Sequence, residues 1–121
     1  MSSYTYSEFQ NACGTNKNDV IPINSVLKDA NDHFNLPTRK SLLDFIFNDG
    51  LENRIFINTK PWMVNPQISV DAYDFNSLSI LGYIAFMYIE TTKKWIIKSF
   101  HLSENRNPIM SLALQNAGLI E

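Results

Sequence analysis

The sequence predicts an α+β fold with three N-terminal helices, a four-stranded and mainly antiparallel sheet that ends in a long hairpin, and a C-terminal helix. In the first half of the chain, apolar residues recur at helical spacing between recognisable start and stop signals. From residue 54 onward the pattern changes to the alternation typical of strands. These strands follow one another with short connections, which favours an antiparallel meander with the helices gathered on one face.

The first two helices are defined by their ends. Thr5 has the position of a helix N-cap with a glutamate three residues later, and Gly14 offers a left-handed stop. Residues 14–19, GTNKND, then read as a polar loop. A second helix begins near Asn24 and must end before Pro37, because the proline ring pushes the preceding residue towards extended geometry.

The third helix begins at Thr38, a good N-cap, and Gly50 closes it. Its apolar residues cover more than half of its circumference, so we expect it near the centre of the fold. Four aspartates lie on or beside the second and third helices, against three basic side chains. A solvated helical face explains these charges best, and an acidic docking face is the alternative.

The strands and the last helix occupy the second half of the chain. Residues 54–59, RIFINT, and residues 68–75, ISVDAYDF, are two expected strands with proline-containing turns beside them. The hairpin over residues 82–103 provides the other two strands. Asn107 and the proline after it open the C-terminal helix, which Gly118 ends.

The hairpin divides its side chains between two faces of the sheet, because side chains alternate along a strand. A loop over residues 91–94 would pair Glu90 with Trp95. The chemically mixed face then holds Tyr88, Glu90, Trp95, Ser99 and His101. The opposite face is more apolar, so we expect it to pack against the helices. Its members are Tyr83, Ala85, Met87, Ile89, Ile96, Phe100 and Leu102, with Lys98 as the one charge.

Composition limits the classes of function. The 121 residues are 45% hydrophobic, enough for one packed α+β domain over residues 1–121. A formal charge of −2 gives no basic stripe for duplex nucleic acid and suits a basic protein partner. Cys13 is the single cysteine and no residues have the spacing of a zinc site, so we expect no cofactor and no metal. The N-terminus lacks a secretory signal and no apolar run spans a membrane, which predicts a cytoplasmic protein.

One interpretation of the mixed face is catalytic. Histidine side chains in general exchange a proton near neutral pH, which makes His101 a candidate acid or base, and Glu90 supplies a complementary carboxylate. Together with Tyr88 and Lys98, they contain the groups that metal-independent RNA cleavage needs: a base for the 2′-hydroxyl, an acid for the leaving oxygen and a cation for the phosphorane. In the expected pairing, however, Glu90 and His101 lie at opposite ends of the hairpin, which favours structural roles for both.

The strand Trp95-Ile96-Ile97-Lys98-Ser99-Phe100-His101 resembles the last strand of some small bacterial endoribonuclease toxins of the RelE and MqsR kind. The resemblance covers only these residues. It implies helices combined with a twisted antiparallel sheet, RNA as the substrate and cleavage without a metal. The chain departs from that group in its acidic charge and in the helix expected after the strand.

The function we favour is that of a small cytoplasmic protein that binds another protein, of the inhibitor, immunity or antitoxin type. Trp62 lies between two prolines beside Lys60, either as an interface anchor in an exposed loop or folded back to cap the core. The expected partner-binding residues are Trp62, Lys60, Trp95, Tyr88 and Ser99. The alternative is the RNA-cleaving enzyme, in which the acting residues are His101, Lys98, Glu90 and Tyr88. A third interpretation buries the mixed face in a homodimer.

Overall fold

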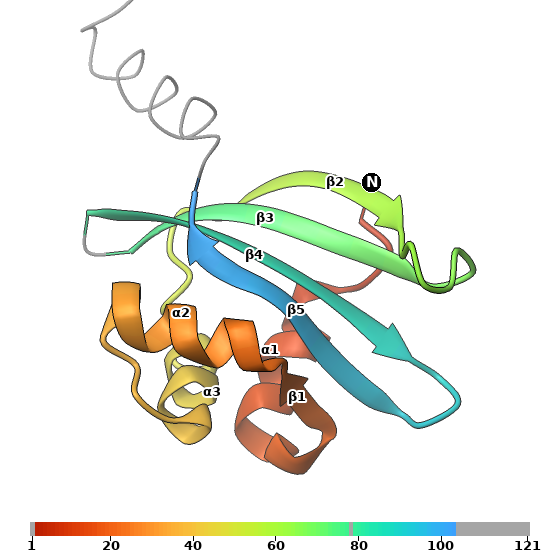
Figure 1. The fold of residues 1–121 in the computed structure, drawn as a ribbon, viewed down its shortest axis with the longest axis horizontal. Coiled ribbons are helices and arrows are strands. Elements are labelled where there is room, and N and C mark those ends of the chain that lie inside the picture. Colours follow the sequence, from red (N-terminus) through yellow and green to blue (C-terminus); the bar gives the residue numbers. More distant parts are fainter. Residues whose placement is uncertain (1, 78, 104–121) are drawn as a thin grey trace, which may run out of the picture.

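The computed structural model describes residues 2–77 and 79–103. A layer of helices covers one face of a strongly twisted sheet (Figure 1). The elements in chain order are α1 (Tyr6–Thr15), the 3-10 turn η1 (Lys17–Asp19), β1 (Val20–Pro22), α2 (Asn24–Phe34), α3 (Arg39–Phe47), β2 (Ile55–Pro61), β3 (Ser69–Ser77), β4 (Ile80–Ile89) and β5 (Lys94–Leu102).

The sheet has five strands in the order β1-β5-β4-β3-β2, and it is mixed because β1 runs parallel to β5. The predicted four-stranded, mainly antiparallel sheet was therefore wrong. The strand that the sequence did not reveal is β1, where Val20 pairs with Trp95 and Pro22 with Ile97. A strand of three residues shows no alternation, and its proline suits only an edge. The predicted helix from Asn107 to Gly118 lies outside the described residues.

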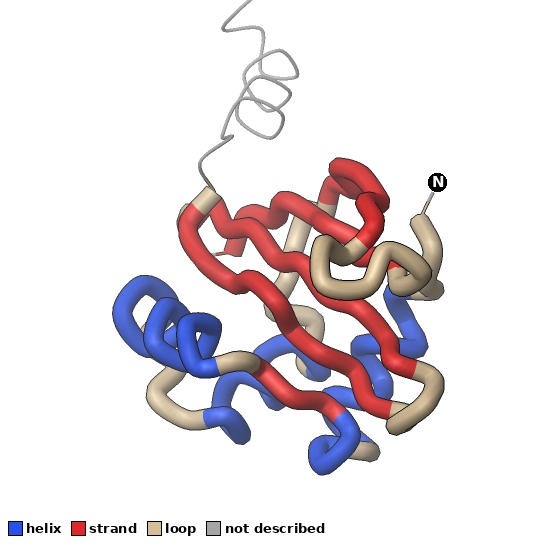
Figure 2. The backbone as a smooth tube through the Cα atoms, turned by 45° about the vertical axis from the view of Figure 1, so that its right-hand side comes forward, coloured by secondary structure: helices blue, strands red, loops and turns tan. Residues whose placement is uncertain are grey.

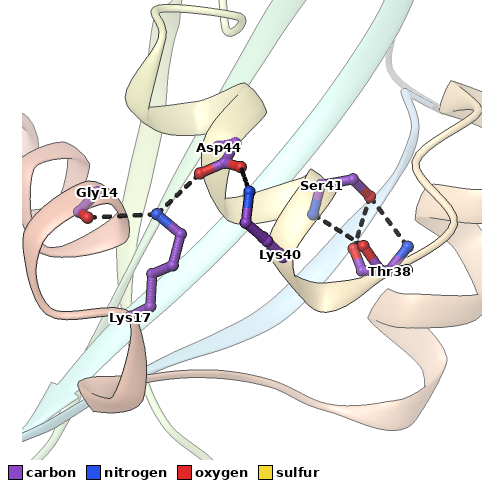
Figure 3. A network of polar contacts seen from close by, with 6 residues as sticks. All are labelled: Gly14, Lys17, Thr38, Lys40, Ser41 and Asp44. Atoms are coloured by element: carbon purple, nitrogen blue, oxygen red, sulfur yellow. Dashed lines mark hydrogen bonds and ion pairs between the residues drawn. The ribbon is translucent and has the colours of Figure 1, made fainter.

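The three predicted N-terminal helices are confirmed, with one change in how the first ends. The Thr38 hydroxyl accepts from the Ser41 N–H at 3.0 Å, and the Ser41 hydroxyl accepts from the Thr38 N–H at 2.9 Å (Figure 3). This reciprocal capping box fixes the start of α3. By contrast, α1 continues through Gly14, where an added Cβ would lie 2.1 Å from the Phe47 ring. Gly14 thus permits the close approach of α1 and α3 and does not end α1.

Ion pairs join the helices on their solvent side. Asp44 on α3 accepts from Lys17 at 2.8 Å and from Lys40 at 2.7 Å, and the Lys17 ammonium also donates to the Gly14 carbonyl (Figure 3). The hydrogen bond from Lys17 is the main reason that the pKa of Asp44 is lowered. Lys28 pairs with Asp32 in the same way along α2. These ion pairs agree with the interpretation of the charges on the second and third helices as a solvated face.

The core lies between the helices and the sheet and is rich in aromatic rings. Phe9 of α1 stacks on Phe86 of β4 with ring centroids 3.9 Å apart. At the other end of the core, Phe34 of α2 lies against Phe100 of β5, with ring centroids 4.7 Å apart. Figures 1 and 2 show all three helices on this one side of the sheet, so the other face carries no helix among the described residues.

Gly82 on β4 gives a direct test of this packing. An added Cβ at Gly82 would lie 2.2 Å from the end of the fully buried Phe75 ring. Because that ring cannot move into solvent, we expect Gly82→Ala to lower the free energy of unfolding by about 1–3 kcal/mol. Gly14→Ala is the comparison, and we expect it to lower the free energy of unfolding by less, because the Phe47 ring that the new Cβ would meet is 39% exposed and can move towards solvent. Urea unfolding measures both; equal effects would contradict the packing described for Phe75.

Candidate functional site

A bulge in β5 decides which side chains face solvent. Ala85 pairs with Ser99, but the next residue of β4, Phe86, pairs with Ile97, so Lys98 has no partner on β4. One extra residue turns the remainder of the strand by one position, which moves every later side chain to the opposite face.

The predicted hairpin register was wrong for two reasons, the position of the loop and the bulge. The loop covers residues 90–93, and Tyr88 pairs with Trp95 where Ile97 was expected. Beyond the bulge, His101 pairs with Tyr83 and not with Ile84. Tyr88 and Trp95 do share a face, as predicted, but it is the face that the helices cover.

The expectation that the more apolar hairpin face packs against the helices was also wrong. The helices cover the face with Ile84, Phe86 and Ile97, whereas Ala85 and Met87 lie on the other one. The large aromatic rings gather on the helical side, and small side chains gather opposite them. We call the second surface the helix-free face; its buried members are Val70, Ala72, Ala85 and Met87.

The loop between β2 and β3 covers part of the helix-free face. Its Trp62 N–H donates to the Ile68 carbonyl at 2.8 Å, and the half-buried Trp62 side chain packs on the apolar cluster. Met63 and Val64 next to it are 96% and 77% exposed. Trp62 therefore folds back onto the sheet, and its two neighbours present the exposed apolar surface.

Two lysines give the helix-free face a local positive charge. Lys60 of β2 and Lys98 of the bulge line a shallow hollow of about 170 Å³ together with Trp62 and Tyr83. Both lysines are exposed, and neither forms an ion pair with a described residue. The net charge of −2 hides this patch, because most of the acidic side chains lie on other surfaces.

His101 lies on the helix-free face, beside Tyr83. Their rings stack with centroids 4.9 Å apart and planes 16° from parallel. The imidazole Nδ1 is 2.7 Å from the Leu102 carbonyl, which can only accept. Nδ1 therefore carries the proton in the neutral ring, and Nε2 is the basic nitrogen. Burial raises the pKa of the Tyr83 phenol, so Tyr83 stays a hydrogen-bond donor at neutral pH.

The buried carboxyl of Asp74 lies on the strand next to the Tyr83–His101 pair. Asp74 of β3 pairs with Tyr83 and is 0% exposed. Its Oδ1 accepts from the Ser103 hydroxyl at 2.9 Å, while its Oδ2 has no hydrogen-bond partner among the described residues. Burial is the main cause that raises the pKa of Asp74. Asp74 could not be assigned to this site from the sequence, because only the bulge brings His101 to its face of the sheet.

The structure thus divides the predicted site residues between two places. His101, Lys98, Ser99, Lys60 and Trp62 lie on or border the helix-free face. Tyr88, Trp95 and Glu90 lie at the tip of the hairpin, with the two aromatic rings on the helical side. His101 and Glu90 are at opposite ends of the hairpin, so they cannot act as an acid–base pair.

Other chemistry finds little support in the part of the chain that the structure describes. Burial raises the pKa of the Cys13 thiol to about 12, so Cys13 is not a thiolate nucleophile at neutral pH. Within residues 2–77 and 79–103, no three His, Cys, Asp or Glu side chains come together in a way that could hold a metal ion. The described helices include none with the length and apolar character needed to cross a membrane.

Comparison with protein-family models, with curated proteins and with solved structures gave no match for this chain. The function is therefore argued from the geometry of its surfaces.

The buried Asp74 carboxyl makes a prediction about pH. Because its pKa is raised, the folded chain holds this proton more tightly than the unfolded chain, whose aspartates titrate near ~3.9. The stability that this group contributes is full below about pH 4 and is lost as the pH rises through the raised pKa. We expect the free energy of unfolding of the wild type, relative to Asp74→Asn, to fall as the pH rises above about 4.

Urea unfolding at several pH values measures this difference, with Asp29→Asn on α2 as the control. Asp29 has no side-chain hydrogen bond with a described residue, and its replacement should leave the pH profile parallel to that of the wild type. Parallel profiles for Asp74→Asn as well would show that the carboxyl is not buried as described.

Proposed function

We propose that this chain is a protein-binding protein of the inhibitor type that acts through its helix-free face. The observation that carries the proposal is the exposed apolar pair Met63 and Val64 next to Trp62, beside two lysines, Lys60 and Lys98, that form no ion pair with a described residue. A cytoplasmic location is part of the same proposal, and the free, buried thiol of Cys13 suits a reducing compartment.

The apolar part of the surface is suited to a protein interface. Tryptophan and methionine are enriched at the centres of such interfaces, and contiguous exposed apolar surface is uncommon away from them. Trp62, Met63 and Val64 supply this surface, with Met63 almost fully exposed. Trp62 is the expected anchor, because it is held in place by the sheet and loses little conformational freedom on binding.

The charges of the face favour an acidic contact on the partner. Lys60 and Lys98 have no carboxylate partner among the described residues, so a partner that supplies carboxylates gains attraction without breaking an existing ion pair. The local charge of the face thus suggests a different partner from the basic one that the net charge suggests.

A second candidate function, RNA cleavage, is favoured by one observation. The basic Nε2 of His101, the phenol of Tyr83 and the ammonium of Lys98 all belong to the helix-free face. His101 would remove the proton of the 2′-hydroxyl, Tyr83 would donate to the leaving oxygen, and Lys98 would stabilise the charge of the phosphorane. Glu90, which the sequence suggested as the acid–base partner of His101, lies at the other end of the hairpin, and Tyr83 takes that role.

Charge reversal tests the favoured function. We expect Lys60→Glu with Lys98→Glu to weaken partner binding at least tenfold, because attraction is replaced by repulsion, while the fold is retained.

Trp62→Ala should weaken binding by about 30-fold, the effect of losing an anchor worth about 2 kcal/mol. The tagged chain captures its partner from cell extract, and calorimetry with the purified partner gives the affinities.

The control is Lys28→Glu with Lys93→Glu, which makes the same charge change on α2 and at the hairpin tip. This control should bind like the wild type; a partner captured equally by all variants would contradict the proposal.

A single-stranded RNA incubated with the wild type in EDTA should stay intact. Cleavage that His101→Ala abolishes would instead establish the second candidate.

A further inference from the structure

We propose that the chain has a second recognition site, a groove at the hairpin tip that binds an arginine side chain of a peptide segment. This site is distinct from the hollow that Lys60 and Lys98 line, and its charge is opposite. It is built by the N-terminal segment, by the first turn of α1, by the loop between β4 and β5 and by the end of the loop between β2 and β3.

The N-terminal segment is fixed by a buried carboxylate on β3. Asp71 is fully buried and accepts hydrogen bonds from the backbone N–H groups of Ser3 and Tyr4, each at 2.9 Å. The Tyr4 hydroxyl donates to the Ser69 carbonyl at 2.7 Å. Three hydrogen bonds thus hold the Tyr4 ring in one position, which makes it a preformed wall of the groove.

The groove has two open hollows, of about 420 and 500 Å³, and Ser3, Tyr4, Tyr88 and Glu90 line both. Trp95 closes the larger one and is 8% exposed. The ring centroids of Tyr4 and Tyr88 lie 5.5 Å and 4.9 Å from that of Trp95. An aromatic surface of this kind attracts a cation through the negative faces of its rings.

Two carboxylates border the larger hollow. Glu8 lies in the first turn of α1, and Glu90 lies in the hairpin loop. Both are exposed, and neither forms an ion pair with a described residue. Burial is the main cause that raises the pKa of Tyr4, and the charges of Asp71 and Glu90 act in the same direction.

Arginine suits this combination better than lysine. Its planar guanidinium can stack on an aromatic ring while its N–H groups donate to carboxylates at the edge, whereas an ammonium is a more strongly hydrated point charge. The amide side chains of Asn11 and Asn16 line the same hollow and add hydrogen-bond acceptors. An anionic ligand would meet two uncompensated carboxylates.

The test uses an acetylated and amidated Gly-Arg-Gly-Arg-Gly peptide, added to the full chain and followed by NMR. We expect the indole N–H signal of Trp95 to shift with saturation, while that of Trp62 does not move. Glu8→Gln with Glu90→Gln should weaken binding at least tenfold, and the corresponding lysine peptide should bind more weakly than the arginine peptide. Glu52→Gln, an exposed glutamate away from the groove, is the matched control and should bind like the wild type.

Unchanged affinity in the Glu8 and Glu90 double variant, or shifts confined to Trp62, would overturn the proposal. So would equal binding of a peptide with glutamates in place of the arginines. The Lys60→Glu and Lys98→Glu variant should keep full affinity for the arginine peptide, so a failed groove and a failed helix-free face give different results.

Discussion

The bulge at Lys98 is the constraint on which the two surfaces of this protein depend. By taking one residue out of the pairing with β4, it turns Phe100 towards the helices and His101 away from them. Phe100 is fully buried against Phe34 and Phe75 as a result. Burying a phenylalanine stabilises a fold by about 1.5–3 kcal/mol, and an unbulged strand would place Ser99 opposite Ile84 in place of Phe100. Core packing thus explains why the bulge persists.

The same division of side chains leaves one face of the sheet without helices. Large rings fill the space under α1 and α2, whereas Ala72 and Ala85 leave the opposite face shallow. Trp62 and its loop cover only part of that face, and Lys60 and Lys98 give it positive charge. At the hairpin tip, where the N-terminal segment crosses the sheet, the charge is negative. A chain with a small net charge can therefore present two surfaces that attract opposite partners.

Much of the fold could be predicted because it depends on local signals. The capping residues of α3, the proline after α2 and the alternation in β2 to β5 all gave elements close to those observed. The sequence could not reveal β1, because a three-residue edge strand has no period and gains its stability from Trp95 and Ile97 on a distant strand. Nor could it reveal the bulge, since Lys98 and Ser99 fit either face and only the burial of Phe100 decides between them. Because the bulge at Lys98 was not predicted, His101 was assigned to the same face of the sheet as Trp95, and Tyr83 was left out of the predicted site.

The position of the His101 ring tests this account most directly, because it reports on the bulge and on the face that depends on it. Nuclear Overhauser effects between ring protons measure which side chains lie within about 5 Å. The account predicts cross-peaks between His101 and Tyr83, whose ring centroids are 4.9 Å apart, and between Phe100 and Phe34. Cross-peaks between Ser99 and Ile84 and between Phe100 and Tyr83, with His101 turned towards α2, would place the strand in the unbulged register and contradict the account.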